Sequence, residues 1–186
     1  MRPDMRKTFA GWLAVLTLLV GSSAHAQFAN RSLGGGLGFI KLFGGSSLGS
    51  ATGVDYAVPL TIEGSLYIEN GFDIYAHIPL MLVSVTRGAS TPSGMGLVFG
   101  TGGHLGARYL FSEETLRPYV GLEIAGFVLV TSNPVVFVGP GVVGGVDYFI
   151  ADTVSIGARG FFDLFIELNV PLRPAVGGTV SIAVYF

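Results

Sequence analysis

The sequence contains no cysteine, which excludes disulfide bonds and thiolate metal sites. Charged residues make up only 12% of the chain, about half of the roughly 25% usual in soluble domains. After the N-terminal segment, no apolar run reaches the roughly 18 residues that a membrane-spanning helix needs. Nevertheless, 50% of the residues are hydrophobic and the mean hydropathy is +0.64. High hydropathy without long apolar runs indicates alternating strands, and 29 glycines argue against long helices.

The N-terminus has the pattern of a secretory signal peptide. Basic residues at Arg2, Arg6 and Lys7 precede an apolar run of about a dozen residues, and Ala24-His25-Ala26 supplies a small-residue cleavage site. The sequence therefore predicts a signal peptide over 1–26 and a mature domain over 27–186. An uncleaved anchor is the alternative, but the apolar run is short for one. The mature domain has seven Lys/Arg against eleven Asp/Glu, a formal net charge of −4, so no basic face for nucleic acid is expected.

Eight stretches of the mature domain show the two-residue alternation of β-strands. Most of them reach the 9 to 11 residues that a tilted membrane strand needs. They are Leu37 to Phe43, Tyr56 to Glu69, Phe72 to Val85, Gly96 to Phe111, Leu116 to Val130, Val135 to Ile150, Thr153 to Glu167, and Gly177 to Phe186.

The connections between these stretches alternate in length. Asn70-Gly71 is a two-residue hairpin signal, and two other connections, 112–115 and 151–152, are also short. The remaining connections are looser, at 44–55, 86–95, 131–134 and 168–176. Short turns on one side and longer loops on the other are typical of membrane barrels, whose short turns are periplasmic.

Each stretch has one apolar face and one mixed face, and the charges fall on the mixed face. In 153–167, for example, Ile156, Phe162 and Ile166 alternate with Arg159 and Asp163. A soluble barrel would turn the mixed face outward and charge it densely. A membrane barrel instead turns the apolar face to lipid and fills its interior with the polar side chains. The few charges favour the membrane barrel. Five apolar-face aromatics near the short turns predict an aromatic girdle: Phe72, Tyr109, Phe111, Tyr148 and Phe186.

The final stretch alternates Val180, Ile182, Val184 and Phe186 with small or polar residues. Such a strand needs a partner on both edges, which predicts closure against the first strand. Four segments resemble the small OmpA-type outer-membrane β-barrel superfamily: 103–111 (GHLGARYLF), 116–121 (LRPYVG), 144–149 (GGVDYF) and the end Val184-Tyr185-Phe186. The resemblance implies an all-β fold, an eight-stranded antiparallel up-and-down transmembrane β-barrel in the bacterial outer membrane. It also implies insertion by the barrel-assembly machinery, with residues 184–186 as the assembly signal.

The predicted lumen is the one polar region in which chemistry is expected. Its predicted polar network is Lys41, Glu63, His77, His104, Arg108, Glu123, Asp147, Arg159, Asp163 and Glu167. An eight-stranded barrel is just wide enough to be filled by side chains, and buried charges must be paired. The network is therefore interpreted as an ion-pair plug. A gated or narrow pore for small solutes is the alternative, and the sequence does not separate the two.

Catalysis and metal binding have weak support in the sequence. His77 and His104 are assigned to the lumen, and neither sits in the His-x-Ser motif of lipid-modifying barrel hydrolases. No catalytic, cofactor or metal site is therefore predicted. The predicted function is a non-enzymatic envelope protein with a structural or surface-interaction role, and a porin-like channel is the alternative. The expected partners are outer-membrane lipid, lipopolysaccharide and the assembly machinery, and the expected state is a monomer.

Overall fold

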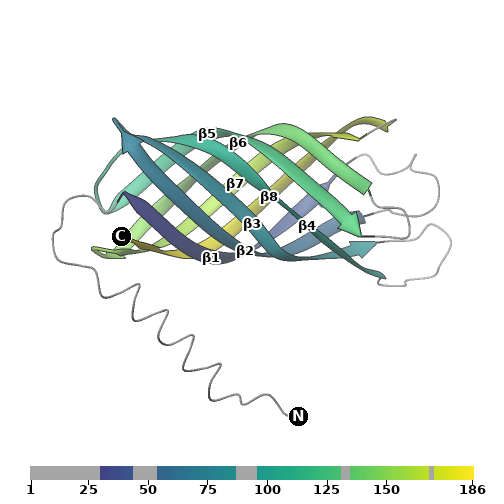
Figure 1. Ribbon diagram of the computed structural model, residues 1–186, viewed down its shortest axis with the longest axis horizontal. Coiled ribbons are helices and arrows are strands. Elements are labelled where there is room, and N and C mark those ends of the chain that lie inside the picture. The colour runs from purple at the N-terminus through teal and green to yellow at the C-terminus, as the bar shows by residue number, and fades with distance from the viewer. Residues whose placement is uncertain (1–29, 44–53, 87–95, 131–134, 168–169) are drawn as a thin grey trace, which may run out of the picture.

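The protein is a closed antiparallel β-barrel of eight strands (Figure 1). The computed structural model describes residues 30–43, 54–86, 96–130, 135–167 and 170–186. The strands are β1 Arg31–Leu42, β2 Val54–Glu69, β3 Phe72–Thr86, β4 Gly96–Leu110, β5 Leu116–Val130, β6 Val135–Ala151, β7 Val154–Glu167 and β8 Val170–Tyr185. Each strand pairs with the next along the chain, and β8 pairs with β1. The predicted up-and-down barrel is confirmed.

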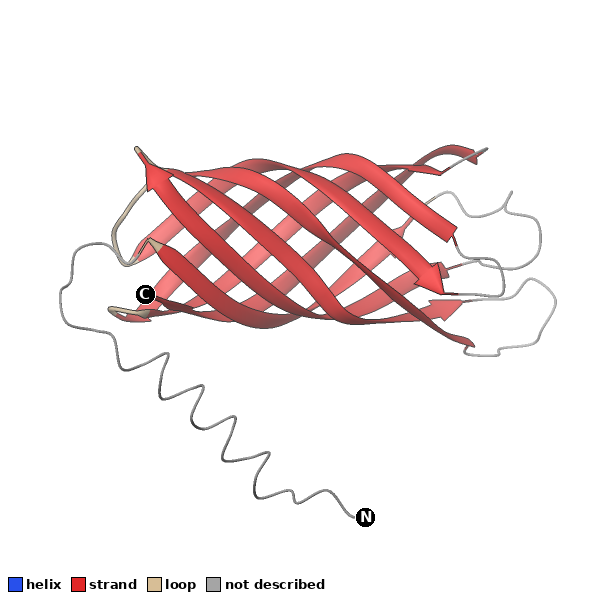
Figure 2. Cartoon of the chain, in the orientation of Figure 1, coloured by secondary structure: helices blue, strands red, loops and turns tan. Residues whose placement is uncertain are grey.

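The described regular structure is all strand, and the strands are tilted steeply across the barrel (Figure 2). In the described ranges, no helix is long and apolar enough to cross a membrane. The predicted signal peptide, 1–26, lies outside the described residues, so its cleavage stays a prediction.

The β2–β3 hairpin turns at Asn70 and Gly71, as the sequence predicted. Both residues have positive φ, 53° and 84°, the backbone that a two-residue type I′ turn requires. Gly71 also donates its backbone N–H to the Tyr67 hydroxyl at 3.0 Å. This turn lies at the same end of the barrel as residues 111–115 and 152–153. The start of β1 and the end of β8 also lie at this end.

Strand β1 begins earlier than the sequence indicated. The prediction began it at Leu37 because of the glycines before it, but β1 runs from Arg31 through that glycine segment. The physical reason is close pairing with β8, since a Cβ added at Gly34 would come within 2.5 Å of the Ile182 carbonyl oxygen. Glycine here permits the approach of two strands at the closing seam.

Strand β8 also begins earlier, at Val170 instead of Gly177. The prediction assigned 168–176 to a loop, and this stretch contains two prolines, Pro171 and Pro174. Pro174 has no N–H to donate, but its carbonyl accepts a hydrogen bond from the Phe43 N–H at 2.9 Å. Only residues 168–169 separate β7 from β8, so the difference in loop length between the two barrel ends is smaller than predicted.

The outer face of the barrel is apolar and exposed along every strand. Leu122 is 70% exposed, Leu105 is 62% and Val180 is 61%. Soluble monomers rarely expose contiguous apolar patches beyond a few hundred Å², so an apolar surface around the whole barrel requires lipid as its solvent. The predicted inversion, with apolar residues outward and polar residues inward, is confirmed.

Aromatic side chains ring the short-turn end of this outer face. Phe72, Tyr109 and Phe111 are 53%, 40% and 62% exposed, and their rings contact in sequence at centroid distances of 5.3 and 5.4 Å. Tyr148 and Phe186 are also exposed, at 51% and 43%. This is the predicted girdle, at the level where amphipathic rings meet the headgroups.

Candidate functional site in the barrel interior

The interior holds eight of the ten side chains in the predicted polar network. These are Glu63, His77, His104, Arg108, Glu123, Asp147, Arg159 and Asp163. Strand alternation places each of them on the inward face, and most are nearly inaccessible: Asp163 is 0% exposed, His77 is 2% and His104 is 3%. The Glu167 side chain lies outside those that the structure describes.

Lys41 is a correction to the predicted network, because it lies on the outer face of β1. It alternates with Ile40, which is 5% exposed and points inward, and it shares its face with Leu37 and Phe39, which are 61% and 56% exposed. Its ammonium lies 5.0 Å from the centroid of the Phe43 ring. A lysine near the end of a membrane strand reaches the polar boundary while its aliphatic stem stays in lipid.

The first group of interior charges, the Arg108 cluster, consists of Asp73, Arg108 and Asp147. The Arg108 guanidinium donates to Asp73 Oδ2 from Nη2 at 2.8 Å and from Nε at 3.1 Å. Its Nη1 lies 3.4 Å from Asp147 Oδ2. The same guanidinium lies over the Tyr119 ring, 4.4 Å from the centroid. One cation is therefore held between two carboxylates and a ring.

The second group, the His104 cluster, consists of His104, Glu123, Arg159 and Asp163. His104 Nε2 lies 3.1 Å from Asp163 Oδ2 and 3.8 Å from Glu123 Oε1. Glu123 Oε2 accepts hydrogen bonds from Arg159 and from the Tyr75 hydroxyl. The cluster joins side chains from β4, β5 and β7, so it ties opposite walls of the barrel together.

Glycines opposite the large polar side chains make room for both groups. The inward positions Glu123, Gly141 and Asp163 are direct cross-strand partners on β5, β6 and β7. A Cβ at Gly141 would lie 2.0 Å from Asp163 Oδ1. Without a side chain on β6, the two carboxylates approach each other across that strand.

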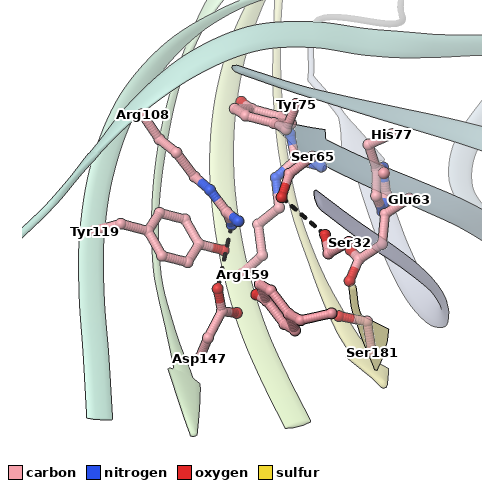
Figure 3. A pocket seen from close by; sticks show the side chains of 12 residues that line it. Ser32, Glu63, Ser65, Tyr75, His77, Arg108, Tyr119, Asp147, Arg159 and Ser181 are labelled. Carbon is pink, nitrogen blue, oxygen red and sulfur yellow. Dashed lines mark hydrogen bonds and ion pairs between the residues drawn. The ribbon is translucent and has the colours of Figure 1, made fainter. Parts of the chain in front are cut away.

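The space left between these side chains is small. One cavity, lined by Glu63, His77, Arg108, Arg159 and eight neighbours, has a volume of about 20 Å³ (Figure 3). A second, at the short-turn end, is lined by Tyr67, Asp73, Glu113 and Arg117 among others, and is also about 20 Å³. A water molecule needs roughly 10–15 Å³ measured this way, so each cavity accommodates about one.

Aromatic rings pack against the His104 ring and continue from it through the interior. His104 contacts Phe161 and Phe127 at centroid distances of 4.8 and 5.3 Å. Phe127 continues to Phe165 at 5.6 Å, and Phe165 to Phe137 at 6.0 Å. The lumen therefore consists of packed charge clusters and a packed aromatic layer.

Among the described residues, sequence reasoning missed two buried charges. Asp73 lies 3% exposed in the Arg108 cluster, and the alternation of β3 already placed it on the same face as His77. Arg173 is also 3% exposed, on the part of β8 that was read as a loop. The signal for Asp73 was present in the sequence, whereas Arg173 needed the correct start of β8.

Comparisons with solved structures identify the same architecture in small bacterial outer-membrane barrels. Neisserial surface protein A (NspA) matches at a TM-score of 0.59 and 19% identity, covering 84% of this chain and 97% of that one. The outer membrane protein OprG of Pseudomonas aeruginosa matches at 0.64 and 12% identity, with 84% and 95% coverage. The attachment invasion locus protein Ail of Yersinia pestis, in complex with the heparin analogue sucrose octasulfate, matches at 0.50 and 10%, with 84% and 97% coverage. No family model matches the sequence, and no curated protein does.

The protein thus has the fold of an eight-stranded outer-membrane β-barrel. The resemblance drawn from its short motifs is confirmed at the level of fold. The proteins that share the fold are outer-membrane proteins, in agreement with the predicted location. At 10% to 19% identity these matches show a common fold only. The role of the interior must therefore be argued from the side chains of this protein.

Proposed function

We propose that the protein is a non-enzymatic outer-membrane barrel with a closed lumen and a structural or surface-interaction role in the cell envelope. The observation that carries this proposal is the packed interior of the described residues, in which the cavity beside Arg108 and Arg159 has a volume of only about 20 Å³. A hydrated solute needs a continuous water path, and paired charges and stacked rings occupy that space instead. The alternative, a narrow channel, would require the Arg108 and His104 clusters to separate.

The surroundings of the histidines support a non-enzymatic role. Serine hydrolysis needs a hydroxyl within hydrogen-bond reach of a histidine that accepts its proton. Among the described residues, His77 has no hydrogen-bond partner at either ring nitrogen, and the one partner of His104 is Asp163. Both side chains are buried away from the lipid face, where a lipid substrate would arrive.

A closed barrel acts through its outer surfaces. The apolar outer face and its aromatic girdle support contact with outer-membrane lipid and with lipopolysaccharide acyl chains, and we propose both as partners, together with the assembly machinery. A monomer satisfies every strand edge, because β1 pairs with β8. The predicted loops 44–55 and 86–95 lie largely outside the described residues. The likeness in fold to the attachment invasion locus protein Ail, solved in complex with a heparin analogue, supports the surface-interaction part of this proposal.

Single-channel recording in planar bilayers tests the closed lumen. Wild-type protein is expected to give no steady openings. Arg159→Ala removes the cation that contacts Glu123, so openings in this variant alone would show that the cluster is the obstruction. Frequent, steady wild-type openings would overturn the proposal and make the channel the function.

A further inference from the structure

We propose that the His104 cluster is a binding site for a divalent transition-metal ion, with His104, Glu123 and Asp163 as its protein ligands. Donor atoms of these three residues all lie within 4.8 Å of one another. His104 Nε2 is 3.1 Å from Asp163 Oδ2 and 3.8 Å from Glu123 Oε1. One imidazole nitrogen and two carboxylate oxygens suit zinc and its first-row neighbours, which bind such ligands at roughly 2.0–2.2 Å. The site goes beyond the proposed function, since a structural metal is compatible with a closed or an open lumen.

Burial distinguishes this group from an ordinary surface cluster of acids. His104 is 3% exposed, Glu123 is 4% and Asp163 is 0%. Two carboxylates this deeply buried cost several kcal/mol each in lost hydration unless cations or hydrogen bonds compensate them. Arg159 compensates Glu123 from the Oε2 side, and Asp163 has the His104 ring nitrogen as its hydrogen-bond partner.

Unpartnered atoms in the cluster support the proposal independently of its geometry. Glu123 Oε1, Asp163 Oδ1 and His104 Nδ1 are all buried without a hydrogen-bond partner among the described residues. Most buried polar atoms in proteins have such a partner, and a cation bound between these residues would supply one to Glu123 Oε1. Glu123 Oε1, on the side of the carboxylate away from Arg159, is a free acceptor for the metal.

Gly141 supplies the space in which the ligands converge. It lies between Glu123 and Asp163 in the cross-strand row, and an added Cβ would be 2.0 Å from Asp163 Oδ1 and 3.1 Å from Glu123 Cγ. A glycine at this position brings both carboxylates together over the middle strand.

His77 packs beside His104 but is not part of the proposed ligand set. It is the direct cross-strand partner of His104, its ring centroid is 5.8 Å away, and it is 2% exposed. Neither of its ring nitrogens has a hydrogen-bond partner among the described residues, so the ligand set comprises His104, Glu123 and Asp163.

The test uses protein purified from membranes without a histidine tag, stripped with EDTA, and titrated with Zn²⁺ in detergent. We expect one tightly held Zn²⁺ per chain after desalting, and a higher thermal midpoint. Histidine ring signals in NMR provide a test that needs no variant, since His77 and His104 are the only histidines outside the predicted signal peptide. Zn²⁺ should shift the His104 signals most strongly. Unchanged signals for both rings would overturn the proposal.

Variants distinguish the site from adventitious binding. His104→Gln and Asp163→Asn should each weaken Zn²⁺ binding by more than the roughly 10- to 100-fold typical of losing an outer-shell partner. Asp147→Asn is the control, because it neutralises another buried carboxylate, 7% exposed, in the Arg108 cluster. Heat-modifiable migration on gels verifies that each variant is folded. Equal Zn²⁺ retention by all three folded variants would show adventitious binding and refute the site.

Discussion

Gly141 on β6 and Asp163 on β7 are direct cross-strand partners, and the Asp163 carboxylate occupies the space that a side chain at Gly141 would need. Gly141→Ala is therefore expected to destabilise the barrel by about 1–3 kcal/mol, the usual cost of overpacking. Denaturant unfolding in detergent micelles or liposomes measures this change.

Gly144→Ala is the control for that substitution, since it lies on the same strand but faces outward. The nearest atom to an added Cβ there is the Tyr119 carbonyl oxygen at 3.7 Å. Alanine at this position restricts the unfolded chain without a clash, so stability should be unchanged or rise by up to about 1 kcal/mol. Equal destabilisation by both variants would mean that strand β6 requires glycine for its backbone and not for the carboxylate.

Arg108→Ala tests the pairing of charges in the Arg108 cluster. The substitution leaves Asp73 and Asp147 buried without their cation, and breaking a buried ion pair in this way costs about 3–5 kcal/mol. Arg31→Ala, at the exposed start of β1, should stay within about 0.5 kcal/mol of wild type. Urea midpoints followed by tyrosine fluorescence measure both changes, and a small effect of Arg108→Ala would show that water readily enters the cluster.

Leu122→Arg tests the membrane face. Leu122 is 70% exposed near the middle of β5, where an arginine facing lipid costs about 2–4 kcal/mol. Phe111→Arg, in the aromatic girdle, should cost only about 0–1 kcal/mol, because the side chain there reaches the headgroups. Folding free energies in phospholipid vesicles decide this, and equal costs at the two depths would contradict the assignment of the membrane mid-plane.

Phe186→Ala tests the predicted assembly signal at Val184, Tyr185 and Phe186. If the assembly machinery recognises this end, the variant should accumulate unfolded in cells while refolding normally in detergent. Phe72→Ala is the control, since it removes another exposed girdle ring next to the same end of the barrel. Similar accumulation of both variants would indicate that the ring of Phe186 serves only as a lipid anchor. Heat-modifiable migration of membrane extracts measures the folded fraction.

The sequence predicted most of the fold because alternation is a local signal. Residues such as Ile156 and Arg159 on β7 reveal the two faces of that strand without any knowledge of its partners, and Asn70-Gly71 marks the β2–β3 turn directly. The predicted strand boundaries were wrong in stretches that contain glycine or proline. The run Gly34 to Gly36 has no side chains that could alternate between two faces, and Pro174 is a residue more typical of loops than of strands.

The many glycines of β1 also explain why Lys41 was wrongly assigned to the interior, because they leave few side chains from which to read the two faces of that strand. On β1 Lys41 points outward and Ile40 inward, whereas the buried charges of the other strands point inward. The sequence predicted most of the other charged side chains that lie inside the barrel. It did not predict which of them contact one another. His104 and Asp163 lie on β4 and β7, which are not neighbours, so their contact depends on the diameter of the barrel and on the register of four strands.

Because β8 pairs with β1, the strands form a closed ring, and the same ring could be built by a chain that begins at a different strand. The Arg31 N–H donates to the Phe186 carbonyl at 3.2 Å, and the Phe186 N–H donates to the Arg31 carbonyl at 2.9 Å, so the two ends of the barrel sequence already touch. A short linker between them, with a cut at Asn70-Gly71, would give a circular permutant with the same barrel and a different last strand. Such a protein would separate the strand pairing that folding requires from the C-terminal signal that the assembly machinery is predicted to recognise.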